Sequence, residues 1–175
     1  MADELEGQWK HDKKLNAKLA KVDKSEKGKV KRAAVVLVLP ETFMNLSGKA
    51  IAPLIKSAKA AEKLVVVHDD IDLPFGTMKL VFDRGDGGHN GVASIIKAIK
   101  TRAFVRVRIG VAPTSASGKT KKPSGEEAVI KFILGKFTPS QDKENKKIIK
   151  RAAEACLAVV TDGRERAMNV YNQSV

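Results

Sequence analysis

Cysteine and aromatic residues are scarce in this chain, and it has no long apolar run. The single cysteine, Cys156, excludes an intrachain disulfide and a cysteine-based metal site. Its apolar helical surroundings predict an inert thiol in a reducing compartment. Aromatic residues make up 5% of the chain, which argues against an RNA-binding protein that stacks single-stranded bases. No run approaches the ~20 apolar residues of a membrane span, and the N-terminus lacks a secretory h-region. We therefore expect an intracellular protein without a membrane partner, in the cytoplasm or the mitochondrial matrix.

Positive charge, in contrast, is abundant. The 175 residues include 33 Lys and Arg against 20 Asp and Glu, a formal net charge of +13. Such an excess favours a polyanionic partner such as nucleic acid, and a surface of solvated lysines is the alternative. The length and a hydrophobic fraction of 43% suit one globular domain, residues 1–175. Within it, the low-complexity segment TSASGKTKKPSG, residues 114–125, predicts a mobile basic loop.

The order of apolar patterns predicts an α/β fold, with one mixed and mostly parallel sheet flanked by helices. We expect strands around residues 15–19 and at 35–39, 64–70, 76–82 and 104–112, and helices at 45–63, 91–100, 125–134, 139–160 and 164–171. The apolar runs at 35–39 and 64–70 are continuous, which is typical of strands buried on both faces in the middle of a sheet. Ser47 is expected to cap the helix at 45–63.

Polar residues beyond strand ends are the candidate site residues, because ligands of α/β sheets bind there. They are Phe43, Met44 and Asn45 after one strand, His68, Asp69 and Asp70 at the end of another, and His89 and Asn90 in the glycine loop DRGDGGHNG. Each cluster has a structural and a functional interpretation. Phe43 and Met44 are either core residues or ligand contacts. The aspartates either cap a turn or orient a catalytic histidine. Asn90 either caps a helix or contacts a substrate that approaches the glycine backbone and the helix N-terminus.

Metal and nucleotide cofactors are not expected. The possible ligands His68, Asp69, Asp70, Asp72 and His89 do not have the spacing of a known metal motif, and neighbouring lysines would repel a divalent cation. No GxGxxG fingerprint opens the first βα unit, so a Rossmann site is excluded as well.

The motifs PETFMNLSGKAIA, VVVHDDIDLPFG, GDGGHNGVASI and VRVRIGVAP, in this order, closely resemble the bacterial-type peptidyl-tRNA hydrolases. The resemblance extends from about Trp9 to Tyr171 and includes FILGKFTPSQ and TDGRERAMN. It implies a monomeric enzyme of that fold, which cleaves the ester between a peptide and the 3′ ribose of tRNA and so recycles tRNA from aborted translation. The implied partner is peptidyl-tRNA, contacted at its acceptor end and its phosphate backbone.

The same resemblance implies roles for individual residues. Phe43, Asn45 and Asn90 match residues that contact the substrate. His89 matches a companion histidine that holds water and substrate, and Asp69 matches the carboxylate that keeps the catalytic histidine basic. Arg108 matches one side of a clamp for a tRNA phosphate. The lysine on the other side of that clamp is replaced by Val81, so Lys79 or Arg84 is expected to substitute for it. Amide side chains suit a site for a carbonyl and an oxyanion because they do not titrate.

The N-terminus departs from the family pattern. The sequence contains neither the GNPG-like turn after the family's first strand nor the RHN-like segment with its general-base histidine. We expect a fold without that strand and an impaired activity, since loss of a general base typically costs on the order of 10²- to 10⁴-fold in rate. Three hypotheses follow. We favour a truncated hydrolase. The alternatives are a non-catalytic RNA-binding protein of the same fold, like the related chloroplast intron-splicing factor, and a hydrolase in which His89 is the base.

Overall fold

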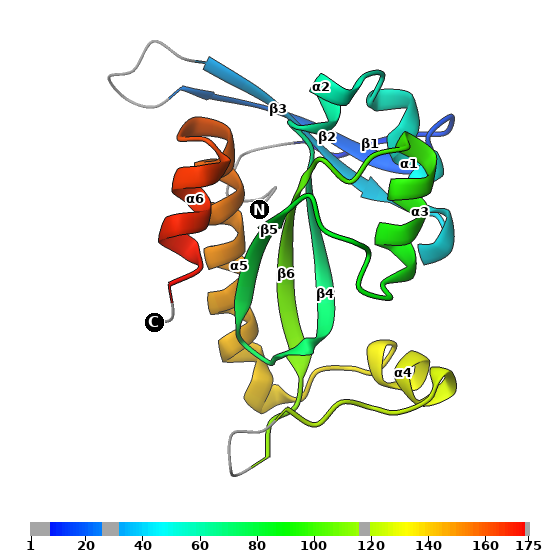
Figure 1. Ribbon diagram of the computed structural model, residues 1–175, viewed down its shortest axis with the longest axis vertical. Coiled ribbons are helices and arrows are strands. Elements are labelled where there is room, and N and C mark those ends of the chain that lie inside the picture. Colours follow the sequence, from blue (N-terminus) through cyan, green and yellow to red (C-terminus); the bar gives the residue numbers. More distant parts are fainter. Residues whose placement is uncertain (1–7, 26–31, 116–119, 174–175) are drawn as a thin grey trace. The chain divides into compact units, whose positions relative to one another are not determined.

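The computed structural model describes residues 8–25, 32–115 and 120–173 (Figure 1). Its strands are β1 (Lys10–Asp12), β2 (Ala17–Ser25), β3 (Arg32–Pro40), β4 (Val65–Pro74), β5 (Met78–Phe82) and β6 (Val105–Ala112). Its helices are α1 (Ser47–Ile51), α2 (Ala58–Ala61), α3 (Asn90–Ile99), α4 (Glu126–Ile133), α5 (Pro139–Thr161) and α6 (Arg164–Tyr171), with 3₁₀ turns η2 (Met44–Leu46) and η3 (Ala52–Leu54). This succession confirms the α/β fold class.

The described residues group into two compact units. One unit holds the residues up to Leu64 together with Phe82–Val105, and the other holds Val65–Val81 and the residues from Arg106 onward. Each unit contains a three-stranded sheet, with strand order β1-β2-β3 in the first and β4-β6-β5 in the second.

The sheet of the first unit is antiparallel, with β2 in the middle. Its register sets Leu19 opposite Val38, and because cross-strand neighbours share a face, these side chains lie on the same side of the sheet as Ala17. That face packs with Leu15 on Ala50 of α1. The alternation of apolar residues around 15–19 therefore predicted a strand here and one of its buried faces. β2 itself begins at Ala17, extends to Ser25 and also buries Ala20 and Val22 on its other face. Residues 26–31, between β2 and β3, lie outside the described residues.

The prediction that residues 35–39 form a central strand buried on both faces is wrong. β3 lies at an edge of the sheet that the described residues form, and its Val36 and Leu39 are 49% and 50% exposed. A continuous apolar run identifies a strand, but its neighbours are decided by pairing between distant segments.

The single helix predicted at residues 45–63 is also wrong. The segment is divided into η2, α1, η3 and α2. Pro53 lies in the first turn of η3, where its ring and missing N–H prevent α1 from continuing. Ser47 is the first residue of α1 rather than its cap: the N-cap is Leu46, and the Ser47 hydroxyl donates to the Met44 carbonyl at 2.8 Å.

α1 packs closely against α3 within the first unit, and Gly48 is the reason. A Cβ at this position would overlap the Ser94 carbonyl oxygen and contact Ala98, so no residue with a side chain fits without moving a helix. The Gly48 N–H also donates to the Ser94 hydroxyl at 3.0 Å. This contact fixes the segment after β3, which carries Phe43 and Asn45, against the helix that begins at Asn90.

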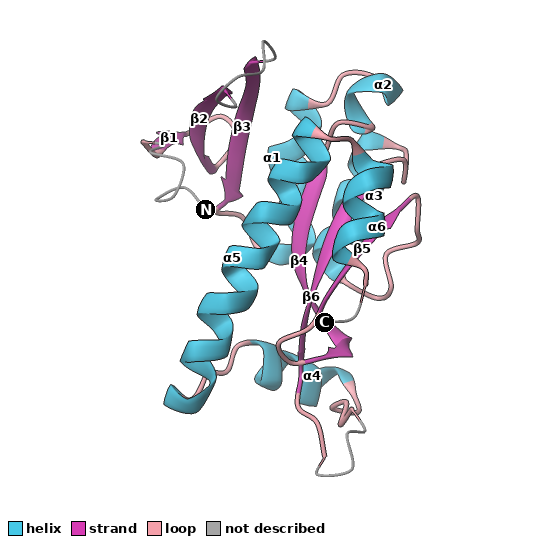
Figure 2. Ribbon diagram, turned by 90° about the vertical axis from the view of Figure 1, so that its left-hand side faces the viewer, coloured by secondary structure: helices cyan, strands magenta, loops and turns pink. Residues whose placement is uncertain are grey.

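In the second unit, β6 lies between β4 and β5 (Figure 2). Val107 of β6 and Leu80 of β5 are fully buried and pack against alanines of α5 and α6, namely Ala152, Ala155 and Ala167. The predicted limits of α4, α5 and α6 agree with the structure to within one residue. The prediction that the strand at 64–70 is central is wrong, because β4 is at an edge of the three described strands and its Val67 is 46% exposed.

The predicted basic loop at 114–125 is described only in part, since residues 116–119 lie outside the described residues. Thr114 and Thr120 form an isolated antiparallel bridge. Beyond it, the backbone N–H of Lys121 donates to the Pro113 carbonyl at 2.7 Å, and Lys122 Nζ contacts Asp72 Oδ1 at 2.6 Å. The described ends of the loop are thus tied to the strand ends of the second unit.

Candidate active site

The glycine loop places His89 at the N-terminus of α3 as its cap. His89 Nδ1 accepts hydrogen bonds from the backbone N–H groups of Gly91 at 3.1 Å and Val92 at 3.2 Å. The backbone reaches this position through Gly87 and Gly88, which have φ of 65° and 77°. The alternative in which Asn90 caps the helix is therefore wrong, because Asn90 is the first residue of α3.

This cap defines the tautomer of the neutral His89 ring. A nitrogen that accepts two backbone N–H groups carries no proton, so the neutral ring has its proton on Nε2. His89 can then donate a hydrogen bond through Nε2, and Nδ1 is not available to take a proton. The cap also occupies two backbone N–H groups of the first turn of α3, which the functional interpretation of the glycine loop left open to a phosphate or an oxyanion.

The structure brings α3 together with the segment that carries the first polar cluster. Gly91 lies so close to Met44 that a Cβ on Gly91 would be 2.5 Å from Met44 Sδ. Asn45, Asn90 and Phe43 are exposed, the last of them by 82%, and His89 is half-buried. The first unit therefore presents two amides and an aromatic ring to solvent beside Met44, which is itself 53% exposed.

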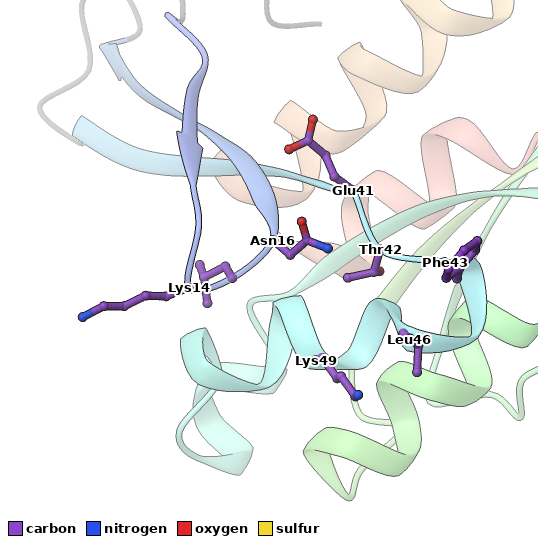
Figure 3. Close-up of a pocket in the computed structure, with 8 residues that line it drawn as sticks. Lys14, Asn16, Glu41, Thr42, Phe43, Leu46 and Lys49 are labelled. Atoms are coloured by element: carbon purple, nitrogen blue, oxygen red, sulfur yellow. The ribbon is translucent and has the colours of Figure 1, made fainter.

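A pocket of about 410 Å³ borders this segment, between the β1–β2 turn and the residues that follow β3 (Figure 3). It is lined by Lys14, Leu15, Asn16, Glu41, Thr42, Phe43, Leu46 and Lys49. The Glu41 carboxylate is already balanced, since His11 Nε2 lies 3.2 Å and Lys18 Nζ 3.4 Å from its oxygens. Among the described residues, Lys14 and Lys49 make no ion pair, so the rim of the pocket is positive.

The second polar cluster lies on β4, in the second unit. Asp69 and His68 are half-buried, and His68 Nδ1 is 2.7 Å from the Asp69 carbonyl oxygen. Asp70 accepts from Arg108 Nε at 2.5 Å, and this pair joins β4 to β6. The pKa of Asp70 is lowered from its ordinary value: burial acts to raise it, and the hydrogen bonds from Arg108 and Asp72 outweigh that effect.

Arg108, the predicted first side of the phosphate clamp, is already contacted by Asp70. Lys79 is exposed on β5, the other neighbour of β6, whereas Val81, at the position where the family lysine was expected, is 8% exposed. Arg84 is exposed in the first unit. Of the two candidates to complete the clamp, only Lys79 shares a sheet with Arg108.

Sequence reasoning did not find the Asp70–Arg108 pair or the Gly48–Ser94 contact. The residues are 38 and 46 positions apart, and no local pattern relates them. Asp70 offered one signal, since it belongs to a group of polar residues that follows the apolar start of the strand. In the part of the chain that the structure describes, no group of His, Cys, Asp and Glu is arranged to hold a metal ion. No helix of this part is long and apolar enough to cross a membrane.

Comparisons with known proteins point to one family. The family model described as "Peptidyl-tRNA hydrolase" matches residues 1–175. The peptidyl-tRNA hydrolase of Aquifex aeolicus is 38% identical over 148 residues, which are 84% of this chain and 72% of that protein. That of Mycobacterium bovis is 35% identical over 170 residues, 97% of this chain and 81% of its own length.

A solved structure gives the same result for the fold. The crystal structure of peptidyl-tRNA hydrolase from Acinetobacter baumannii superposes with a TM-score of 0.77 at 28% identity. The match covers 98% of this chain and 80% of that one.

Proposed function

Because the chain belongs to the peptidyl-tRNA hydrolase family, we propose that it hydrolyses the ester bond between peptide and tRNA in peptidyl-tRNA, releasing both. One observation carries the proposal beyond the family match. The exposed amides of Asn45 and Asn90 belong to two segments that pack together through Met44 and Gly91. An ester carbonyl that enters between such segments meets donors that bind a developing oxyanion at any pH.

The backbone N–H groups at the start of α3 contribute little to that oxyanion. Those of Gly91 and Val92 already donate to His89. In our proposal the donors are therefore side chains, namely Asn45, Asn90 and the Nε2–H of His89. Phe43, which is 82% exposed, offers an apolar surface for the substrate beside them.

The general base is the second requirement of ester hydrolysis, because water must lose a proton as it attacks. The cap geometry of His89 favours a donor role for this ring and speaks against the hypothesis that it is the base. In our proposal the base is the histidine of the family's RHN-like segment, which this sequence does not contain and which an extended chain would supply. Asp69 orients that histidine, as the family resemblance implies, rather than taking the proton itself.

Binding of the tRNA part is proposed to rest on phosphate contacts. The net charge of +13 supplies a general attraction for a polyanion, and Arg108, Lys79 and Arg84 are the candidate contacts. Phosphate contacts suit an enzyme that accepts many tRNAs, because they carry no sequence information. We propose that the protein works as a monomer, in the cytoplasm or the mitochondrial matrix.

The test is cleavage of an N-blocked aminoacyl-tRNA by this chain, beside the same chain extended at its start by the corresponding residues of the Mycobacterium bovis relative. The proposal is supported if the chain or its extended form cleaves the ester and Asn90→Ala abolishes this activity. Inactivity of both forms with retained tRNA binding would instead favour the non-catalytic RNA-binding protein. Activity of the unextended chain that is lost in His89→Asn would return His89 to the role of base.

A further inference from the structure

Arg108 and Asp70 form a largely enclosed ion pair in the second unit. Arg108 lies on β6, the central strand, and Asp70 on its neighbour β4. The side chains are 25% and 10% exposed, whereas those of the nearby Lys122–Asp72 pair are 53% and 46% exposed. A pair that is largely withdrawn from water holds a more definite geometry than one at the surface.

The Asp70 carboxylate is held at both oxygens. Oδ2 accepts from Arg108 Nε at 2.5 Å, and Oδ1 accepts from the backbone N–H of Asp72 at 2.8 Å. A carboxylate bound at both ends cannot rotate without breaking a hydrogen bond. Its lowered pKa keeps it ionised throughout the neutral range. Asp70 is therefore a fixed negative charge on β4.

Arg108 uses only one of its three nitrogens in this pair. The contact is through Nε, and among the described residues Nη1 and Nη2 make no hydrogen bond. The guanidinium is a planar fork, so anchoring Nε also sets the direction of the terminal nitrogens. Two parallel N–H groups of this kind match two oxygens of a phosphate.

We propose that Asp70 is a positioning residue, which anchors Arg108 through Nε so that its terminal nitrogens bind a phosphate of the tRNA. The inference rests on the proposed function, since it names the group that directs a phosphate contact of that substrate. Asp70 itself does not touch the RNA. An arginine without this anchor must lose the freedom of its long side chain when it binds, which weakens the contact.

The first test is Asp70→Asn, measured as the Kd for an N-blocked aminoacyl-tRNA by filter binding. The amide oxygen can still accept from Asp72, but the amide group cannot replace a carboxylate at Arg108 Nε. We expect binding to weaken by about tenfold. In a form that cleaves, KM is expected to rise and kcat to stay nearly constant, because positioning for binding acts on ground and transition states alike. Asp70→Glu, which keeps the carboxylate, should restore part of the affinity.

Asp72→Asn is the matched control. It removes the same charge from the same strand and breaks the exposed pair with Lys122, but leaves the Asp72 backbone N–H to Asp70. We expect it to leave the Kd unchanged or slightly lower, since it removes a negative charge near the RNA. Equal effects of Asp70→Asn and Asp72→Asn would overturn the proposal.

The direction in which Asp70→Asn changes the Kd distinguishes an Asp70 that positions Arg108 from an Asp70 that competes with phosphate for it. If Asp70 competed with phosphate for Arg108, Asp70→Asn would tighten binding, and that result overturns the proposal. Arg108→Lys keeps the charge but lacks the fork, so it should weaken binding, and adding Asp70→Asn to it should cost nothing further. Thermal unfolding of each variant checks that the fold is retained.

Measurements of tRNA binding and cleavage distinguish a failure of the positioning role from a failure of the proposed function. If wild-type protein binds tRNA and Arg108→Lys binds equally well, the phosphate contact is elsewhere and only the positioning role is lost. If wild-type protein neither binds nor cleaves the aminoacyl-tRNA in either form, both proposals fail.

Discussion

Asn172 completes the hydrogen bonding of Leu80 as a neighbouring strand would. Its Oδ1 accepts from the Leu80 N–H at 2.7 Å, and its Nδ2 donates to the Leu80 carbonyl at 2.9 Å. Leu80 is fully buried and belongs to β5, which is an edge strand of the three described in its sheet. One amide, positioned just after α6, thus satisfies both backbone groups of a buried edge residue.

Asn172→Ala is expected to destabilise the protein clearly. It leaves a buried N–H and a buried carbonyl without partners, and each such group costs about 1–3 kcal/mol. We expect a loss of about 2 kcal/mol or more in the free energy of unfolding, measured by urea titration. Asn172→Asp keeps the acceptor and should lose less. A loss no larger than that of a surface substitution, within about 0.5 kcal/mol, would show that water replaces the amide.

His89 variants separate its cap role from its donor role. Asp and Asn both cap helices well, but only Asn also carries an N–H donor. In unfolding measurements, we expect His89→Asn and His89→Asp to stay near wild type and His89→Ala to lose about 1 kcal/mol. In ester cleavage, we expect the rates of His89→Asp and His89→Ala to fall by on the order of 10²-fold, whereas His89→Asn should retain more of the wild-type rate. Equal loss in all three variants would contradict the donor role.

Asn90→Ala is expected to remove most of the ester cleavage and to leave stability nearly unchanged. The helix is capped by His89, and Asn90 is an exposed first residue of α3, so the amide contributes little to folding. Loss of an oxyanion donor costs about 10²- to 10³-fold in kcat. The comparison is between kcat and the melting temperature of the same preparation. A clearly lower melting temperature would mean that the amide stabilises the loop, and the lost activity would then say nothing about catalysis.

Cys156 is expected to resist thiol reagents as long as the protein is folded. It packs against the core of the second unit, and burial raises its pKa from the ordinary 9.0 to about 12. A rise of that size lowers the thiolate population about 10³-fold at pH 8. Alkylation followed by mass spectrometry should therefore be slow in buffer and rapid in urea.

The raised pKa of Cys156 also makes the stability of the fold depend on pH. The unfolded thiol loses its proton from about pH 9 upward, while the folded one keeps it, so this residue destabilises the fold as the pH rises from 9 towards 12. Cys156→Ala should lose less stability between pH 8 and pH 10 than wild type. Identical pH profiles of the two proteins would contradict a buried thiol.

Local sequence patterns predicted elements whose limits depend on nearby residues. α6 was expected at 164–171 and is found there, because Gly163 precedes a helical pattern that is decided by contacts three and four residues apart. Of the two long strands of the N-terminal sheet, the first was predicted from alternation and the second from its continuous apolar run. In the candidate site, the motifs alone brought Phe43, Asn45, His89 and Asn90 to attention, and their roles in substrate contact stay predictions.

The sequence by itself therefore determined the α/β class and the family, and it named the residues that we propose carry the chemistry. Only the tertiary structure decided that β3 and β4 are edge strands, that Pro53 divides one expected helix, and that His89 rather than Asn90 caps α3. It alone paired Asp70 with Arg108 and Leu80 with Asn172, which are 38 and 92 positions apart. The physical reason is that helix and strand propensities act over a few residues, whereas strand order and buried polar pairs depend on which distant segments pack together.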